Sequence, residues 1–162
     1  MDSVASLVTD NALTYGDVLP EGGALLCLDL GTKTIGVATC DAGWRYATAG
    51  KTIPRSKFTK DCIALRAIVA ERSIKGVVIG LPRNMDGTEG PRAQASRAYA
   101  RNLAGTLDLP VLLWDERWST SSAEAAMIGQ DMSRAKRAGK IDSHAAAVIL
   151  QGAIDTLAGG GF

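Results

Sequence analysis

The sequence predicts a single α/β domain built on a mixed five-stranded sheet with helices on both faces. Three apolar runs follow one another closely over residues 24–53, which is typical of an antiparallel meander. Beyond them, helical and strand patterns alternate, and strand–helix–strand crossovers normally return parallel in the same sheet. The length of 162 residues, 46% of them hydrophobic, suits one compact core and excludes a second large domain.

Residues 1–23 precede this pattern; they are acidic, contain only scattered apolar residues and end in Leu-Pro-Glu-Gly-Gly. We expect an appended N-terminal acidic arm there, the α/β domain itself over 24–158 and a flexible tail over 159–162. No Lys or Arg precedes Lys33, whereas secretory and transit peptides need basic N-terminal residues. No apolar run approaches the roughly twenty residues that span a membrane. These features predict a cytoplasmic protein with no membrane partner.

The first three strands are expected at the runs ALLCLDL, TIGVATC and WRYATAGKTI, which are separated by short turns and end before Pro54. Residues 59–73 then place apolar side chains at helical spacing, and VVIGL follows as a fourth strand. An alanine-rich helix over RAQASRAYARNLAGTL leads to the fifth strand, VLLWDE. Hydroxyl-bearing N-cap residues introduce SAEAAMIG, and IDSHAAAVILQGAIDTLA forms the closing helix.

Cysteine content and charge narrow the possible chemistry. Cys27, Cys40 and Cys62 are odd in number and form no CxxC pair, so we expect reduced core residues rather than a zinc site or disulfides. A formal net charge of +1 excludes a protein that coats nucleic acid indiscriminately. The cations nevertheless gather at 83–101 and 134–140, which leaves room for a short basic track beside an acidic centre.

Three acidic positions lie where apolar elements begin or end. Asp29 ends the first strand, the pair Asp115 and Glu116 ends the fifth, and Asp142 opens the closing helix on the side that faces the sheet. Carboxylates that converge on one point repel one another unless a multivalent cation neutralises them, and oxygen ligands select hard cations such as Mg²⁺ or Mn²⁺. Phosphodiester cleavage assisted by two metal ions uses such a cluster.

Each of these acids also has an ordinary structural interpretation. Asp29 could shape a turn, and Asp142 could cap its helix. Asp115 or Glu116 could pair with Arg117. Their joint occurrence at convergent ends of elements favours the metal site.

Four blocks occur in order over residues 24–157: LCLDLGTKTIGVATCD, VVIGLPRNMDGTEGPRAQ, LLWDERWSTSSAE and IDSHAAAVILQ. They resemble the blocks of the YqgF family, also called RuvX, of RNase H-like nucleases. The resemblance implies an RNase H-like fold, with catalytic and metal-binding carboxylates at Asp29, in the Asp115–Glu116 block and at Asp142. Within that block it favours Glu116, with Asp115 as the substitute.

The resemblance also implies an activity, that of a hydrolase that cleaves phosphodiester bonds in structured nucleic acid with Mg²⁺ or Mn²⁺. The first substrate that it suggests is the 5′ end of pre-16S rRNA, whose processing belongs to ribosome biogenesis. The alternative is the resolution of Holliday junctions in DNA recombination and repair, for which a homodimer would supply two matched sites. A remoter alternative is a non-catalytic nucleic-acid-binding module on the same fold.

The glycine-rich loop after the fourth strand is too polar for a core, and it offers donors to a phosphate beside the start of the next helix. Arginines extend a positive strip along that helix. Two polar residues in the turn after Asp29 could contact the phosphate or only shape the turn. The ordinary alternative is a solvated helix face after a long turn. The expected nucleic-acid-binding residues are Thr32, Lys33, Arg83, Asn84, Thr88, Arg92, Arg97 and Arg117.

Overall fold

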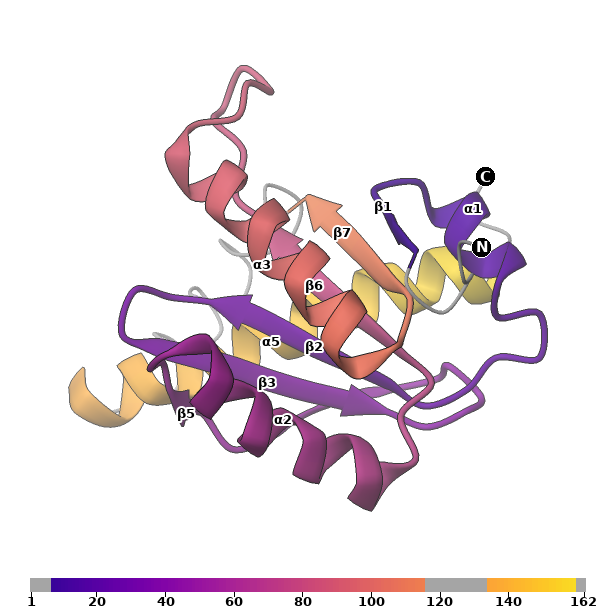
Figure 1. Cartoon of the computed structure of the whole chain (residues 1–162), viewed down its shortest axis with the longest axis horizontal. Coiled ribbons are helices and arrows are strands. Elements are labelled where there is room, and N and C mark those ends of the chain that lie inside the picture. Colours follow the sequence, from indigo (N-terminus) through magenta and orange to yellow (C-terminus); the bar gives the residue numbers. More distant parts are fainter. Residues whose placement is uncertain (1–6, 116–133, 160–162) are drawn as a thin grey trace.

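The computed structural model describes residues 7–115 and 134–159, and for residues 134–142 it describes the backbone alone. Figure 1 shows one sheet with helices packed on it. The helices and strands along the chain are β1 (Val8–Thr9), α1 (Ala12–Asp17), β2 (Leu25–Leu30), β3 (Thr34–Cys40), β4 (Ala47–Ala49), β5 (Ile53–Pro54), α2 (Phe58–Arg72), β6 (Gly76–Leu81), α3 (Pro91–Leu107), β7 (Val111–Asp115) and α5 (Arg134–Ala158).

The described strands form one mixed sheet in the order β1-β7-β6-β2-β3-β4, with β5 paired to β3. β2 and β3 are antiparallel, whereas the pairs β2 with β6, β6 with β7 and β1 with β7 are parallel. The predicted mixed α/β sheet is therefore confirmed. The strand count is seven rather than the five expected from the sequence.

The additional strands have two sources. β1 comes from the N-terminal segment, and the third expected strand is divided into β4 and β5. Ala49 pairs with Ala38, and Ile53 pairs with Ile35. The segment from β4 to β5 therefore advances by four residues while β3 advances by three. One extra residue bulges out between the two pairings, and such a bulge interrupts a strand locally.

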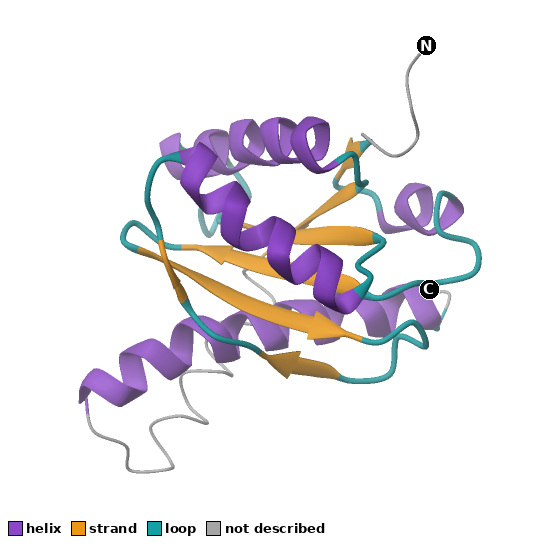
Figure 2. Ribbon diagram, turned by 60° about the horizontal axis from the view of Figure 1, so that its bottom comes forward, coloured by secondary structure: helices purple, strands orange, loops and turns teal. Residues whose placement is uncertain are grey.

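Helices cover both faces of the sheet, as predicted (Figure 2). Side chains alternate along β2: Leu26, Leu28 and Leu30 belong to a core beneath α2 and α3, whereas Leu25 and Cys27 belong to a core beneath α5. Together with the strand pairings, this alternation shows to which face of the sheet each residue of the neighbouring strands belongs.

The segment expected as an acidic arm contributes β1 and α1 to this architecture. Tyr15 on α1 is completely buried, and its hydroxyl donates to the carbonyls of Val77 at 3.0 Å and Pro110 at 3.3 Å. A side chain at Gly76 would collide with the Tyr15 hydroxyl, so the glycine makes room for it. Residues 8–17 are therefore packed on the sheet rather than merely attached to it.

The closing helix begins earlier than the sequence predicts. α5 starts at Arg134, so Asp142 lies inside the helix and neither opens nor caps it, which corrects that expectation. The preceding stretch RAKRAGKI consists mostly of good helix formers, which allow the helix to extend toward its N-terminus. The stripe that contains Ala145, Ala146 and Ile149 is buried against the sheet as expected.

Two further expectations concern the core and the membrane. Cys27, Cys40 and Cys62 are all buried, which confirms their prediction as core residues, and they form no disulfide bond among the described residues. No helix in residues 7–115 and 134–159 combines the length and apolar character that crossing a bilayer requires.

Candidate active site

Asp29 lies at the carboxyl end of β2, on the face of the sheet covered by α5. Its side chain follows the alternation of Leu25 and Cys27, and the residue paired with it across β3 is Gly36. On the other side, the register that pairs Leu28 with Ile79 makes Gly80 the next residue of β6. No side chain therefore flanks Asp29 on either neighbouring strand. The carboxylate is half-buried and forms no hydrogen bond or ion pair with the described residues.

Asp115 ends β7 at the same edge of the sheet but belongs to the opposite face. Val111 and Leu113, which alternate with it, lie in the core beneath α2 and α3. The Asp115 carboxylate is 10% exposed, and its Oδ2 lies 3.6 Å from Nη1 of Arg83. Asp29 and Asp115 thus share one end of the sheet and differ in the face to which they belong.

The remaining predicted ligands lie outside the described side chains. Glu116 and Arg117 fall in the undescribed stretch 116–133, and for Asp142 only the backbone is described, one helical turn before Ala145. Among the described residues there is no group of three or more acidic, histidine or cysteine side chains that could hold a metal ion. The predicted metal site accordingly stays a prediction.

The turn after Asp29 contains two of the residues that were predicted to bind nucleic acid. Thr32 and Lys33 are exposed, and the turn closes through a hydrogen bond from the Gly31 N–H to the Thr34 carbonyl at 2.9 Å. A Cβ at Gly31 would lie 2.9 Å from that same carbonyl oxygen, so only glycine allows so tight a turn without displacement. The turn therefore presents Lys33 to solvent beside the end of β2.

Two arginines hold this turn from the α2 and α3 side. Nη1 of Arg55 donates to the Gly31 carbonyl at 2.7 Å, and Nη2 of Arg92 donates to the Leu30 carbonyl at 3.4 Å. Arg92 was expected to contact nucleic acid, whereas Arg55 carried no signal in the sequence. Its position follows only from the pairing of β5 with β3.

Arg83 and Arg97, predicted to contact phosphate, are engaged by carboxylates. Arg83 forms ion pairs with Asp10 at 3.3 Å, Glu89 at 3.4 Å and Asp115 at 3.6 Å. Arg97 grips Glu89 with two hydrogen bonds of 2.6 and 2.7 Å, and also reaches Asp10 at 3.4 Å. These bonds from Arg97 are the main reason that the pKa of Glu89 is lowered.

Asn84 and Thr88 are the other residues of this loop that were predicted to bind nucleic acid. They are hydrogen-bonded to each other, and Thr88 is also hydrogen-bonded to Asp86. Nδ2 of Asn84 donates to Oγ1 of Thr88 at 3.0 Å, and that hydroxyl donates to Oδ1 of Asp86 at 2.6 Å. The loop after β6 is thus closed by its own polar side chains. Its donors have internal partners in this conformation.

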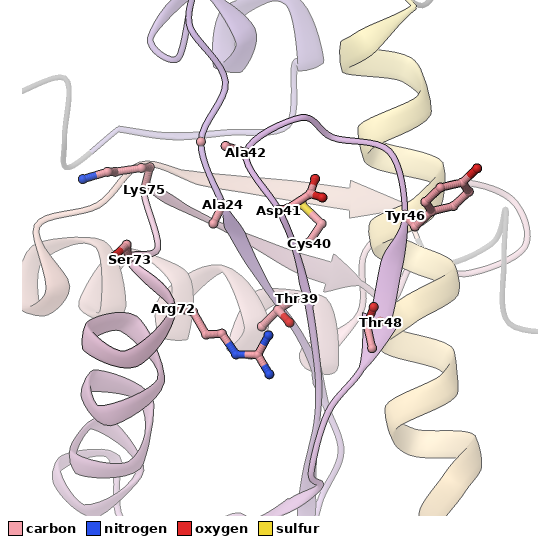
Figure 3. Close-up of a pocket in the computed structure, with 11 residues that line it drawn as sticks. Ala24, Thr39, Cys40, Asp41, Ala42, Tyr46, Thr48, Arg72, Ser73 and Lys75 are labelled. Carbon is pink, nitrogen blue, oxygen red and sulfur yellow. The ribbon is translucent and has the colours of Figure 1, made fainter.

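A groove of about 680 Å³ opens at the other end of the sheet, where β2 and β6 begin (Figure 3). The guanidinium of Arg72 extends toward Thr39, whereas the ammonium of Lys75 extends away from them. Burial raises the pKa of the Cys40 thiol in its wall to about 11, so the thiol is protonated at neutral pH and is a poor nucleophile. The groove contains none of the predicted site residues, and we do not assign the active site to it.

Comparison with known proteins places the chain among nucleases. A family model described as "RuvX: Holliday junction resolvase" matches residues 23–156. A protein of Novosphingobium aromaticivorans named "Putative pre-16S rRNA nuclease" is 66% identical over 96% of this chain and 100% of its own length. A protein of the same name from Sphingopyxis alaskensis is 60% identical over 93% of this chain and 99% of its own length.

Among solved structures, the chain is similar to T. thermophilus RuvC in complex with a Holliday junction substrate. The TM-score is 0.52 at 14% sequence identity, and the match covers 86% of this chain and 97% of RuvC. At that identity the likeness concerns the fold, which agrees with the RNase H-like sheet expected from the sequence.

Proposed function

The chain belongs to the RuvX family, and from that premise we propose that it is an endonuclease that hydrolyses phosphodiester bonds in structured nucleic acid, with the precursor of 16S rRNA as its first substrate. The observation that carries the proposal is the placement of Asp29. Its half-buried carboxylate lies at a strand end between two glycine positions, beneath the helix that carries Asp142. A carboxylate placed in this way suits a ligand that brings positive charge to it.

We propose Asp29, Glu116 and Asp142 as the residues that hold the metal. Their oxygens fit a hard cation, Mg²⁺ or Mn²⁺, and a half-buried carboxylate without a cation partner among the described residues is consistent with that role. When bound, such ions activate water and neutralise charge on the leaving oxygen. Asp115 is the weaker candidate, because it belongs to the face opposite Asp29 and already pairs with Arg83.

The turn after Asp29 supplies the nearest contact to the substrate in this proposal. The Lys33 ammonium is a compact charge on a flexible stem, which suits a backbone phosphate, and the Thr32 hydroxyl can donate to the same group. Arg83 and Arg97 would bind phosphate only by exchanging it for Asp10 and Glu89. The proposed set is completed by Asn84, Thr88, Arg92 and Arg117.

A second candidate function is the resolution of four-way DNA junctions. The description of the matching family model favours it, and the RuvC structure with a related fold contains such a junction. Two matched nicks require two active sites, so this function needs a symmetric homodimer.

One cleavage experiment decides between these functions. A 16S rRNA precursor, a four-way DNA junction and a matched DNA duplex are offered in parallel with Mg²⁺ or Mn²⁺, and the oligomeric state is measured on the same sample. Cleavage of the precursor by the wild type, lost in both Asp29→Asn and Asp142→Asn, supports the first proposal. Preferential nicking of the junction by a dimer favours the second, and cleavage that persists in both variants refutes the proposed site.

A further inference from the structure

Arg55 grips the turn that follows Asp29 with both its backbone and its side chain. The Arg55 N–H donates to the Lys33 carbonyl at 2.9 Å, while Nη1 of its guanidinium donates to the Gly31 carbonyl at 2.7 Å. The two accepting carbonyls flank Thr32, so one residue spans the whole exposed part of the turn. A charged donor makes a stronger hydrogen bond to a carbonyl than a neutral donor does.

The Arg55 guanidinium is itself held in place by the aromatic ring of Tyr99. Its Cζ lies 5.4 Å from the ring centroid, within the range of a cation–π interaction. Phe58 supports the same ring from the side, with the ring centroids 5.1 Å apart and the rings at 83°. The side chain of Arg55 is therefore confined between α3 and the turn. Because it is already confined, it loses less conformational entropy when it forms the hydrogen bond to the Gly31 carbonyl.

Asp61 connects this arrangement to helix α2. Asp61 is only 2% exposed, its Oδ2 accepts a hydrogen bond from the Tyr99 hydroxyl at 3.2 Å, and its Oδ1 accepts one from the N–H of Ser56 at 2.9 Å. Burial, with a contribution from the nearby Asp61 carboxylate, raises the pKa of Tyr99, so that its hydroxyl stays protonated and keeps donating. Asp61 thus anchors both the ring beneath Arg55 and the residue that follows Arg55.

We propose that Arg55 is a positioning residue for phosphodiester cleavage, which fixes the turn over residues 31–33 and thereby the placement of Lys33 and Thr32 relative to the Asp29 carboxylate. The proposal rests on the proposed nuclease function. Asp29 lies two residues before the carbonyl that Arg55 holds, so movement of the turn displaces both the carboxylate and the phosphate contacts. Misplacement of a reacting group by about 1 Å can cost on the order of 100-fold in rate.

Arg66 provides a matched control on the same pair of helices. Like Arg55, it uses a guanidinium to hold a backbone carbonyl, that of Thr106 at 3.4 Å, and so joins α2 to the end of α3. It does not contact the turn after β2. A variant at this position removes an arginine-to-carbonyl bond without touching the candidate site.

The experiment compares full-length Arg55→Gln, Arg55→Lys and Arg66→Gln with the wild type. It measures kcat and KM on the nucleic acid that the wild type cleaves, amide hydrogen exchange over residues 31–34, and thermal stability. We expect Arg55→Gln to lower kcat by about 10- to 100-fold, with a smaller change in KM, and to accelerate exchange over 31–34. Arg55→Lys should recover little of either, because an ammonium cannot span the ring and the carbonyl as the planar guanidinium does. Arg66→Gln should leave kcat and this exchange unchanged.

Unchanged exchange over residues 31–34 in Arg55→Gln overturns the proposal, whatever the activity of the variant. Accelerated exchange with wild-type kcat overturns it as well, because the turn would then not matter for cleavage. A loss of kcat that only follows a loss of thermal stability, shared by Arg66→Gln, assigns Arg55 a structural role instead. Failure of the nuclease function looks different, since the wild type itself would then cleave none of the nucleic acids.

Discussion

The two faces of the sheet differ most at the edge where β2 and β7 end. On the α5 face, Asp29 stands between two glycine positions and has no hydrogen-bond or ion-pair partner among the described residues. On the α3 face, Asp115 meets Arg83, which also contacts Glu89 and Asp10. Among the described residues, the same residue type at equivalent strand ends is thus unpaired on one face and neutralised on the other. A carboxylate that is half-buried and open can bind a cation, whereas a paired one has its cation already.

The largest expected effect separates these two aspartates. Asp29→Asn should lower kcat for nucleic-acid cleavage by at least about 100-fold, as expected when an electrostatic group of an active site is removed. Asp115→Asn should cost less, about 10-fold, because it weakens the arrangement around the site without removing a proposed ligand. Steady-state cleavage rates with saturating Mg²⁺ or Mn²⁺ provide the measurement. Circular dichroism serves as the folding control, and an equal loss in the two variants would contradict the distinction between the faces.

The next effect concerns the segment that brings Asp10 to the α3 face. Tyr15→Phe removes the hydroxyl that donates to the carbonyls of Val77 and Pro110, at a site with no exposure to solvent. Loss of a buried hydrogen-bond donor should lower the free energy of unfolding by about 1 to 3 kcal/mol. Urea denaturation measures this difference. A variant as stable as the wild type would show that the N-terminal segment is only loosely attached.

A smaller effect should distinguish free from paired cations. Lys33→Gln should weaken binding of uncleaved nucleic acid several-fold and reduce the salt dependence of binding, because it removes one exposed charge close to the site. Arg97→Gln should weaken binding less, since Arg97 is already paired with Glu89 and Asp10. Fluorescence anisotropy at several salt concentrations and without divalent metal tests the order. A larger loss in Arg97→Gln would mean that substrate displaces those carboxylates.

The smallest effect is a pH dependence of stability. Hydrogen bonds from Arg97 hold the pKa of Glu89 below its ordinary value of 4.5. A carboxyl group whose pKa is lowered in the folded state stabilises the protein above its ordinary pKa, and this contribution disappears as the pH falls through the lowered value. Because the pair is partly exposed, less than about 1 kcal/mol is expected. Thermal melts of the wild type and Glu89→Gln should differ at pH 7 and converge as the pH falls through the lowered pKa of Glu89; a constant difference would contradict this cause.

Much of the architecture could be predicted from local patterns in the sequence. The short apolar runs of β2, β3, β6 and β7 and the helical spacing of α2 and α3 are local properties, and the structure confirms them to within a few residues. The division of the third strand could not be predicted, because the bulge between Ala49 and Ile53 depends on pairing with β3. The early start of α5 was missed because the charged stretch before Asp142 resembles a solvated loop as much as a helix.

The sequence by itself determined the fold class, the family and the acidic residues at the ends of elements, because periodicity and ordered motifs are written along the chain. Only the tertiary structure decided which charges are free. The five ion pairs that Asp10, Glu89 and Asp115 form with the two arginines, the glycines beside Asp29 and the contacts of Arg55 with the turn all depend on how the elements pack. The contacts that involve Asp10, Asp115 and Arg55 join residues far apart in the sequence. The residue type fixes the charge of a side chain, but its neighbours decide whether that charge can bind a ligand. Strand register and helix packing determine which residues are neighbours.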